Sequence, residues 1–227
     1  SENIGACARA IKNFNFKKLI LINPKPVFPN DKIIATSVGA KDVIKNSKVF
    51  KNLESSINNF DYLIATTSRF RNKNIKHIKL NELNRIDFRK KVAFLFGSEA
   101  SGLSNNEISY ANCVMQIPTN PNFKSLNLSH SVIIIAQVVS SIIKSKNSKY
   151  SKSKKIKFAS KNDIQLMTNF CINMLENKNF FKPKEKKPIM LENLRNIFYK
   201  MELSEKEIRI LSSVFANLAK KKVDWQN

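Results

Sequence analysis

The stretch that decides the fold is KVAFLFGSEASGLSNNEISYANCVMQIPTNPNFKSLNLSHSVIIIAQVV, which runs from Lys91 to Val139. It contains two apolar runs of strand length, Val92–Phe96 and Val114–Ile117, and a polar loop follows each of them. Loops at the carboxyl ends of neighbouring parallel strands converge on one edge of a sheet, where α/β folds bind ligands. We therefore expect the loops Gly97–Ser104 and Pro118–Asn127 to form a ligand site.

Glycine is concentrated in the first of these loops. The chain has only 4 glycines, where average composition gives roughly 16, and Gly97 and Gly102 both lie here. They indicate special backbone geometry, although spacing alone leaves ordinary turn glycines equally open. The second loop ends in a helix-start signal, Ser125–Leu128, and the apolar helix predicted over Ser131–Ile143 would pack beneath both loops.

The chain before this stretch alternates predicted helices and strands, which favours an α/β fold with a mostly parallel sheet. The lysine-rich segment Arg71–Lys91 has no clear period and is predicted to be a surface loop with a little helix. The other predicted elements are a helix Asn3–Phe14 with Asn3 as its N-cap, a strand Leu19–Ile22, a helix Asp31–Ala40, a strand near Val49, a helix from about Glu54 and a strand Asp61–Thr66.

The composition changes after Ile143. Residues 144–161 hold eight lysines and no acidic residue, which is typical of a solvated linker or an arm that touches RNA. Amphipathic helices then return over Ile164–Leu175 and Met190–Met201, and a capping box at Ser204–Glu207 begins a last helix. We predict a domain of residues 1–143, a basic linker of residues 144–161 and a small all-α module of residues 162–227 that serves RNA binding, dimerisation or both.

Charge and cysteine usage limit the function. The net charge is +23, which favours a polyanionic partner, although the Lys-, Asn- and Ile-rich composition accounts for part of it. The three cysteines form no CxxC pair, so the sequence predicts neither a zinc site nor a disulfide framework, and a reducing cytoplasm fits best. The longest apolar run, Val132–Val139, is shorter than a membrane span, so no membrane association is expected.

Three segments resemble, in the same order, the three motifs of the SpoU family of RNA 2′-O-ribose methyltransferases. They are NIGACARAIKNF (Asn3–Phe14), FGSEASGLS (Phe96–Ser104) and IPTNPNFKSLNLSHSV (Ile117–Val132). The third motif and the tail LRNIFYKMELSEKEIRIL (Leu194–Leu211) are most similar to the TrmJ branch, whose members methylate anticodon-loop position 32 of tRNA. The resemblance extends from Ser1 to about Leu218. It implies a C-terminal trefoil knot, which is rare among folds, S-adenosyl-L-methionine as cofactor, tRNA as partner, and a homodimer.

The resemblance also implies which residues hold the methyl donor. Their backbone groups, in the three loops at the strand ends, would bind the adenosine and methionine parts without a metal ion. These residues are Thr66, Thr67, Ser68, Gly97, Ile117, Pro118, Lys124, Ser125 and Leu126.

The implied catalytic residues are Asn3, Arg9, Glu99, Ser125 and Asn127. Because a guanidinium is always protonated, we expect Arg9 to bind the substrate phosphate and stabilise the forming alkoxide rather than act as a base. The family delivers this arginine from the partner subunit. Glu99 is expected to be buried and to orient its loop through backbone amides or an arginine. Ser125 and Asn127 should cap the following helix and also contact donor or ribose.

Each of these residues also has an ordinary structural interpretation. A lone helix arginine is usually a solvated charge, a loop glutamate is usually a surface charge, and a polar residue before a helix is often only a cap. At the level of the whole protein, two alternatives stay open. One is methylation of ribosomal RNA or of another tRNA position, and the other is a non-catalytic RNA-binding protein that retains the fold.

Overall fold

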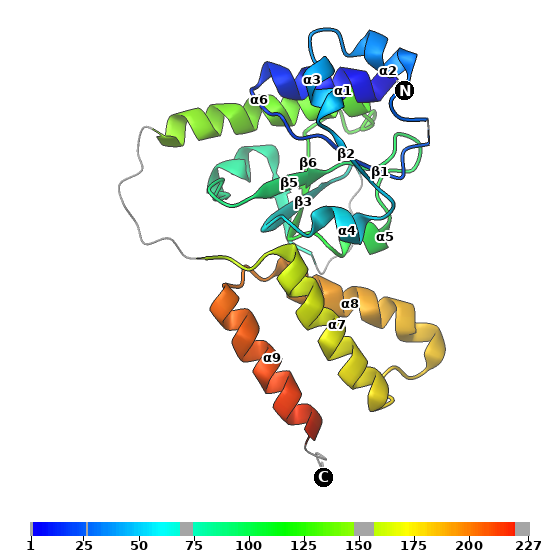
Figure 1. The fold of residues 1–227 in the computed structure, drawn as a ribbon, viewed down its shortest axis with the longest axis vertical. Coiled ribbons are helices and arrows are strands. Elements are labelled where there is room, and N and C mark those ends of the chain that lie inside the picture. Colours follow the sequence, from blue (N-terminus) through cyan, green and yellow to red (C-terminus); the bar gives the residue numbers. More distant parts are fainter. Residues whose placement is uncertain (1, 26, 69–74, 148–156, 221–227) are drawn as a thin grey trace.

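A computed structural model describes residues 2–25, 27–68, 75–147 and 157–220 of the chain (Figure 1). Helices and strands are interspersed up to residue 147, and only helices follow within the described residues 157–220. The elements are α1 (Glu2–Asn13), β1 (Ile20–Ile22), α2 (Asp31–Thr36), α3 (Lys41–Lys45), β2 (Lys48–Phe50), α4 (Leu53–Ile57), β3 (Tyr62–Thr66), β4 (His77–Lys79), the 3-10 helix η1 (Leu80–Arg85), β5 (Val92–Leu95), α5 (Asn105–Ile108), β6 (Cys113–Gln116), α6 (Leu128–Asn147), α7 (Lys161–Asn177), the 3-10 helix η2 (Lys184–Lys186), α8 (Lys187–Lys200) and α9 (Glu205–Lys220).

Four of the strands form the central sheet, in the order β4-β6-β3-β5, and all of its neighbouring pairs are parallel. Thr66 lies opposite Met115 of β6, and Ala65 lies opposite Leu95 of β5. The strands therefore end at the same edge, as predicted. β1 and β2 form a separate parallel pair. The α/β class with C-terminal helices is confirmed, and the trefoil knot stays a prediction.

The apolar run of β3 has no polar face because both sides of the sheet are covered. Alternate residues of a strand point to opposite faces. Leu63 and Ala65 contribute to the core shared with α4, α5 and the C-terminal helices. Tyr62 and Ile64 contribute to the core beneath α6. Figure 1 shows α6 on one side of the sheet and α7, α8 and α9 on the other.

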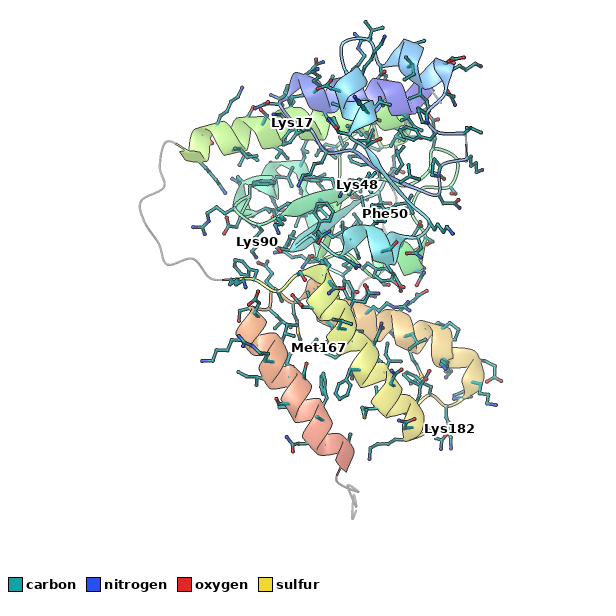
Figure 2. All side chains as sticks on the ribbon, viewed as in Figure 1. Lys17, Lys48, Phe50, Lys90, Met167 and Lys182 are labelled. Atoms are coloured by element: carbon teal, nitrogen blue, oxygen red, sulfur yellow. The ribbon has the colours of Figure 1, made fainter. Side chains whose placement is uncertain are left out.

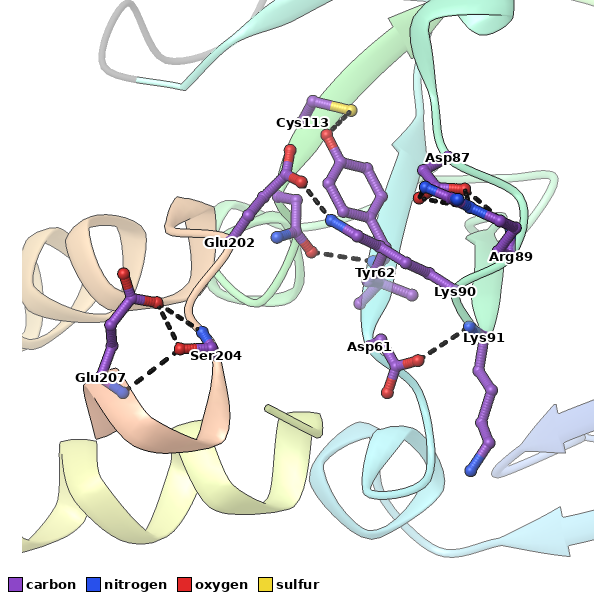
Figure 3. Close-up of polar contacts among 12 residues, drawn as sticks. Asp61, Tyr62, Asp87, Arg89, Lys90, Lys91, Cys113, Glu202, Ser204 and Glu207 are labelled. Carbon is purple, nitrogen blue, oxygen red and sulfur yellow. Dashed lines mark hydrogen bonds and ion pairs between the residues drawn. The ribbon is translucent and has the colours of Figure 1, made fainter. Parts of the chain in front are cut away.

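The C-terminal helices dock on the sheet through the same core and through polar contacts. Lys90 forms an ion pair with Glu202, and its Nζ lies 3.7 Å from the ring centre of Phe158 (Figure 3). On α7, the Lys161 backbone N–H donates to the Phe60 carbonyl at 2.7 Å. The apolar side of the interface includes Met167 of α7, which is 2% exposed (Figure 2). The three-part domain division stays a prediction, and the structure adds that its first and last parts share a core.

Lys161 is a charged residue that is fully buried in this interface. Its Nζ donates to the Tyr199 carbonyl at 3.0 Å, and burial lowers the pKa of the lysine to about 7. Between this pH and the usual 10.5, the unfolded chain binds more protons than the folded one. The contribution of Lys161 to the free energy of unfolding therefore rises with pH across this window, by up to about 1.4 kcal/mol per pH unit.

We expect Lys161→Met to remove this pH dependence. The free energy of unfolding of the variant, relative to that of the parent, should be higher at about pH 6 than at about pH 9. The reason is that only the parent must bury a charge at the lower pH. Thermal unfolding followed by circular dichroism at both pH values measures the difference. Lys178→Met, at the end of the same helix, is the control. An equal shift in Tm at both pH values would contradict the prediction.

Several predicted elements have different boundaries in the structure, and three of them matter here. The helix predicted over Asp31–Ala40 ends at Thr36, because Ser37 caps it and Gly39 has a φ of +77°. Asn3 is not an N-cap, since α1 already includes Glu2. The apolar helix predicted over Ser131–Ile143 is longer and extends from Leu128 to Asn147. Its last turn therefore occupies the beginning of the predicted linker, of which residues 148–156 lie outside the described part.

The prediction of a surface loop with a little helix over Arg71–Lys91 was right about the helix and wrong about the surface loop within the described residues 75–91. This segment contains β4, which pairs with β6 at the edge of the sheet, and η1. Four of its apolar side chains are buried: Ile75, Ile78, Leu83 and Ile86. A three-residue strand followed by a 3-10 turn is too short to produce a sequence period, so the pattern could not reveal either element.

By length and composition, Leu128–Lys146 of α6 could cross a membrane, and no other such helix was found among the described residues. The eight-residue run Val132–Val139 did not predict a helix of this kind. One side of α6 packs against the rest of the protein, because α1 lies along it and Ile135 and Val139 contact the sheet, and 28% of this span is buried. The remaining apolar residues of α6 include Ile133, which is 37% exposed.

Candidate active site

The predicted donor residues lie at the carboxyl edge of the sheet, where β3, β5 and β6 end side by side. Thr66 closes β3, and its hydroxyl donates to the Leu95 carbonyl at 3.0 Å. The Thr67 backbone N–H donates to the Met115 carbonyl at 3.1 Å. These two threonines therefore hold the strand ends together, and the exposed Ser68 continues from them.

The loop after β5 is closed on itself around Gly97. A Cβ at Gly97 would lie 2.1 Å from the Gly102 carbonyl carbon and 2.4 Å from the Leu103 nitrogen. Gly102 has a φ of +67°, and its N–H donates to the Ser98 carbonyl at 2.8 Å. Both glycines are therefore required by the loop itself, and this close approach of backbone to backbone presents Glu99 at the tip.

Glu99 joins the three motifs in one polar junction. Its Oε2 accepts a hydrogen bond from Asn3 Nδ2 at 2.7 Å, and its Oε1 accepts one from Asn127 Nδ2 at 3.0 Å. Asn127 Nδ2 also lies 3.2 Å from Asn3 Oδ1 and donates to it. Glu99 and Asn127 thus meet Asn3 beside the strand ends, although they lie 96 and 124 residues after it in the chain. We call these three residues the amide–carboxylate junction.

The structure corrects the expectation for Glu99. In the single chain its side chain is exposed, not buried. Its partners are two side-chain amides rather than backbone amides or an arginine. The hydrogen bonds of Glu99 connect its loop to α1 and to the loop before α6. The spacing of the motifs could not identify these contacts, and the catalytic role of Glu99 stays a prediction.

Ser129 belongs to this arrangement and was missed in the sequence. Its backbone N–H and its hydroxyl both donate to Asn127 Oδ1, at 2.9 and 2.7 Å. With Oδ1 occupied, the Asn127 amide must present its NH2 group to Glu99. Asn127 thus both caps α6 and supports the junction. Ser125 does not cap this helix, contrary to the prediction, because α6 begins only at Leu128. A serine two positions after a helix-capping asparagine was the available signal.

The third loop places apolar and polar groups beside each other. Ile117 and Leu126 are half-buried, whereas Pro118, Lys124 and Ser125 are exposed. Half-buried aliphatic side chains next to irregular backbone suit a ligand with a flat apolar part and polar edges. The residues at this edge therefore fit an adenosine-bearing donor.

Cys7 lies on the inner side of α1, below the junction. Burial, and then the charge of Glu99, raise the pKa of Cys7 to about 12. It is therefore a thiol at neutral pH and packs with Ala10 and Val132 as a small apolar residue.

Arg9 is exposed on α1. Six residues of α-helix place it about 9 Å further along the axis than Asn3 and about 120° around it. Its side chain therefore leaves the helix on a different side from the junction. The structure does not bring Arg9 into contact with the other predicted catalytic residues of its own chain.

Among the described residues, no group of three or more His, Cys, Asp or Glu side chains could hold a metal ion. The three cysteines are free and buried.

Comparison with known proteins identifies the family of the chain. The profile of the SpoU rRNA Methylase family matches residues 1–137, which is more than half of the chain. The chain belongs to this family. The match includes all three motifs and the whole amide–carboxylate junction, and the prediction of a methyltransferase is confirmed. S-adenosylmethionine is the methyl donor of the family.

Relatives in the family cover the C-terminal helices as well. The tRNA (cytidine-2'-O-)-methyltransferase TrmJ of Methanocaldococcus jannaschii is 27% identical over 95% of this chain and 94% of its own. The TrmJ of Sulfolobus acidocaldarius is 37% identical over 59% of this chain and 57% of its own. The crystal structure of TrmJ from Z. mobilis ZM4 superposes with a TM-score of 0.85 at 28% identity, covering 96% and 94% of the two chains. The resemblance to the TrmJ branch is confirmed.

Proposed function

We propose that this protein transfers a methyl group from S-adenosylmethionine to the 2′-hydroxyl of a tRNA ribose, at anticodon-loop position 32. The amide–carboxylate junction carries the proposal, because it assembles all three motifs beside the strand ends where the donor residues lie. The TrmJ relatives, named for 2′-O-methylation of tRNA, support the choice of substrate.

We assign the following roles in methyl transfer to the residues of this chain. The loops of Thr66–Ser68, Gly97, Ile117–Pro118 and Lys124–Leu126 bind the donor, which supplies an electrophilic methyl group when bound. Glu99 keeps the second loop in register with α1 and α6. Ser125 contacts the ribose. The Asn127 amide, whose hydrogen bonds go to Asn3, Glu99 and Ser129, positions this loop rather than binding the ribose itself. Arg9 binds the neighbouring phosphate and stabilises the forming alkoxide.

We further propose that the protein acts as a homodimer in the cytoplasm. The dimer is supported by the partly exposed apolar surface of α6, including Ile133, which lies alongside α1. It is also supported by the position of Arg9, which points away from the junction of its own chain. The three free, buried cysteines are compatible with a reducing compartment.

Mass spectrometry of nucleosides tests the function. Purified protein, S-adenosylmethionine and unmodified tRNA should produce a 2′-O-methylated nucleoside, and mapping of nuclease fragments should place it at position 32. The second candidate substrate is ribosomal RNA, which the family description and the Haemophilus influenzae relative named as a tRNA/rRNA methyltransferase favour. Methylation of ribosomal RNA but not tRNA would select that alternative. No methylation of either would refute the proposal.

Donor binding should not require a metal ion, because backbone groups and aliphatic side chains form the proposed donor site. We expect calorimetry to give the same affinity for S-adenosylmethionine with and without excess EDTA. Leu126→Arg should lower this affinity by roughly 10- to 100-fold, since a charged side chain would replace an apolar contact. Val49→Ala, on β2, is the control. A loss of affinity in EDTA would contradict the expectation.

The lysines of residues 148–156 lie outside the described part, so their contribution is predicted from charge alone. We expect replacement of Lys149, Lys152 and Lys154 by Gln to weaken tRNA binding and leave donor affinity unchanged. Each lost phosphate contact should reduce the slope of log Kobs against log salt by about 0.7–0.9. Fluorescence anisotropy at several salt concentrations measures this slope.

The control for these lysines is a triple replacement of the exposed Lys41, Lys48 and Lys51 by Gln, which removes the same charge from another surface. If both triple variants change the slope equally, the effect is one of net charge and the segment has no specific role. If the helices α7, α8 and α9 serve dimerisation rather than RNA binding, sedimentation will show it.

A further inference from the structure

Phe123 is an aromatic side chain that the fold leaves in solvent. It is 75% exposed, compared with 51% for Phe180, the other strongly exposed phenylalanine of the described residues. It lies in the loop between β6 and α6, four residues before Asn127, and so at most about 14 Å from it along the chain. An exposed phenyl ring forgoes its hydrophobic stabilisation, and here it does so beside the active site.

The backbone under this ring is held in a defined turn. The Phe123 N–H donates to the Asn120 carbonyl at 3.0 Å, and the Asn122 N–H donates to Asn120 Oδ1 at 2.9 Å. Residues 120 and 123 also form an antiparallel bridge. The turn therefore fixes where the ring emerges, and the ring projects outward rather than into the core.

The surroundings of the ring suit a polyanion rather than a protein. Lys124 follows it directly and is exposed, and the chain has no acidic residue between Glu107 and Asp163. The carboxylate of the active site, Glu99, already accepts two amide hydrogen bonds. One apolar ring among exposed polar residues is a poor centre for a protein interface, which needs a larger apolar core. An aromatic face next to a cation is how proteins bind unpaired bases of RNA.

We propose that Phe123 stacks on an unpaired nucleobase of the RNA substrate, adjacent to the nucleotide whose ribose enters the site at Asn127. Stacking would hold the flanking base away from the site of methyl transfer and fix the register of the RNA strand relative to the amide–carboxylate junction. Lys124 would bind the phosphate of the stacked nucleotide. This inference rests on the proposed function for the identity of the substrate. It assigns to the third motif a base-binding role in addition to donor binding.

Three substitutions separate stacking from other roles of the ring. Against a hairpin RNA with a single-stranded loop, Phe123→Ala should weaken binding by roughly 10- to 100-fold. Phe123→Leu, which keeps the apolar volume without a π face, should lose nearly as much. Phe123→Tyr should stay within about threefold of the parent. The salt slope should be unchanged in all three, whereas Lys124→Gln should lower it by about 0.7.

A fluorescence measurement reports the contact directly. Trp225 is the only tryptophan of the chain, so Phe123→Trp in a Trp225→Phe background gives a single indole at the site. Its emission should be quenched by the hairpin RNA and not by the same sequence in a full duplex. Val49→Ala should leave RNA binding unchanged.

Several results would overturn the inference. They are an unchanged indole emission at saturating hairpin RNA, a Phe123→Leu variant that binds like the parent, a Phe123→Ala variant that loses affinity for S-adenosylmethionine, and a Phe123→Ala variant that loses the dimer in sedimentation. The last two would assign the ring to the donor or to a second copy of the chain. A parent protein that methylates no RNA would refute the proposed function, while the quenching by hairpin RNA would still decide whether the ring stacks.

Discussion

Arg9→Ala is expected to lower the rate of methyl transfer by about 100- to 1,000-fold, which is the usual effect of removing one group that stabilises a developing oxyanion. Donor affinity should be unchanged, because Arg9 is exposed and the proposed donor residues are at the strand ends of β3, β5 and β6. Single-turnover kinetics and calorimetry on the same variant measure the two quantities. Arg85→Ala, which removes an exposed arginine paired with Glu82, should leave both unchanged.

The geometry of α1 predicts that Arg9 serves the pocket of the partner subunit. Asn3 meets Glu99 of its own chain, and Arg9 leaves the helix about 120° away from that side. A twofold dimer would give each site one arginine from the other chain. Mixing Arg9→Ala with a donor-site variant should then restore activity, because a mixed dimer contains one complete site.

Gly97→Val is the second variant for this mixture. The added side chain would collide with the backbone at Gly102 and Leu103 and displace the loop that carries Glu99. Random exchange makes half of the dimers mixed, each with one working site of two, so the mixture should reach about a quarter of the parent activity. If exchange is confirmed by native mass spectrometry and the mixture stays inactive, Arg9 acts within its own chain or has no catalytic role.

Glu99→Gln should lower kcat/KM by roughly 5- to 150-fold, although it changes one atom and removes one charge. A carboxylate offers two acceptors, and the junction uses both of them. Glutamine offers one acceptor and one donor, so an NH2 group must face another NH2 group. Once the bound substrate covers the junction, an unsatisfied polar contact of this kind costs about 1–3 kcal/mol.

The neighbouring amides cannot rotate to relieve this conflict. Ser129 occupies Asn127 Oδ1 with two hydrogen bonds, so Asn127 must keep donating. If Asn3 reversed its amide to accept from the introduced glutamine, its own NH2 would face that of Asn127. The loss in Glu99→Gln should therefore be nearly as large as in Glu99→Ala. Glu185→Gln, an exposed residue of η2, is the control, and parent-like kinetics for Glu99→Gln would show that the junction has no influence on turnover.

The apolar runs and the motif sequences of the loops were enough to predict the parallel α/β core, the two strand-end loops, the family and the capping box at Ser204. Each of these depends on residues close together in the chain, or on a motif whose residues are contiguous. Burial on both faces made β3 and β6 continuous apolar runs. The Ser204 hydroxyl indeed accepts from the Glu207 N–H while Glu207 accepts from the Ser204 N–H.

Only the tertiary structure decided which residues of separate motifs meet. Glu99 required partners, but the sequence could not show that they are the amides of Asn3 and Asn127, because those contacts span 96 and 28 residues. The same holds for β4, which exists through pairing with β6, and for the docking of the C-terminal helices through Lys90 and the Lys161 backbone N–H. In each case the stabilising partner is distant in the chain. Sequence periodicity can indicate that a residue is buried or paired, but not which distant residue it contacts.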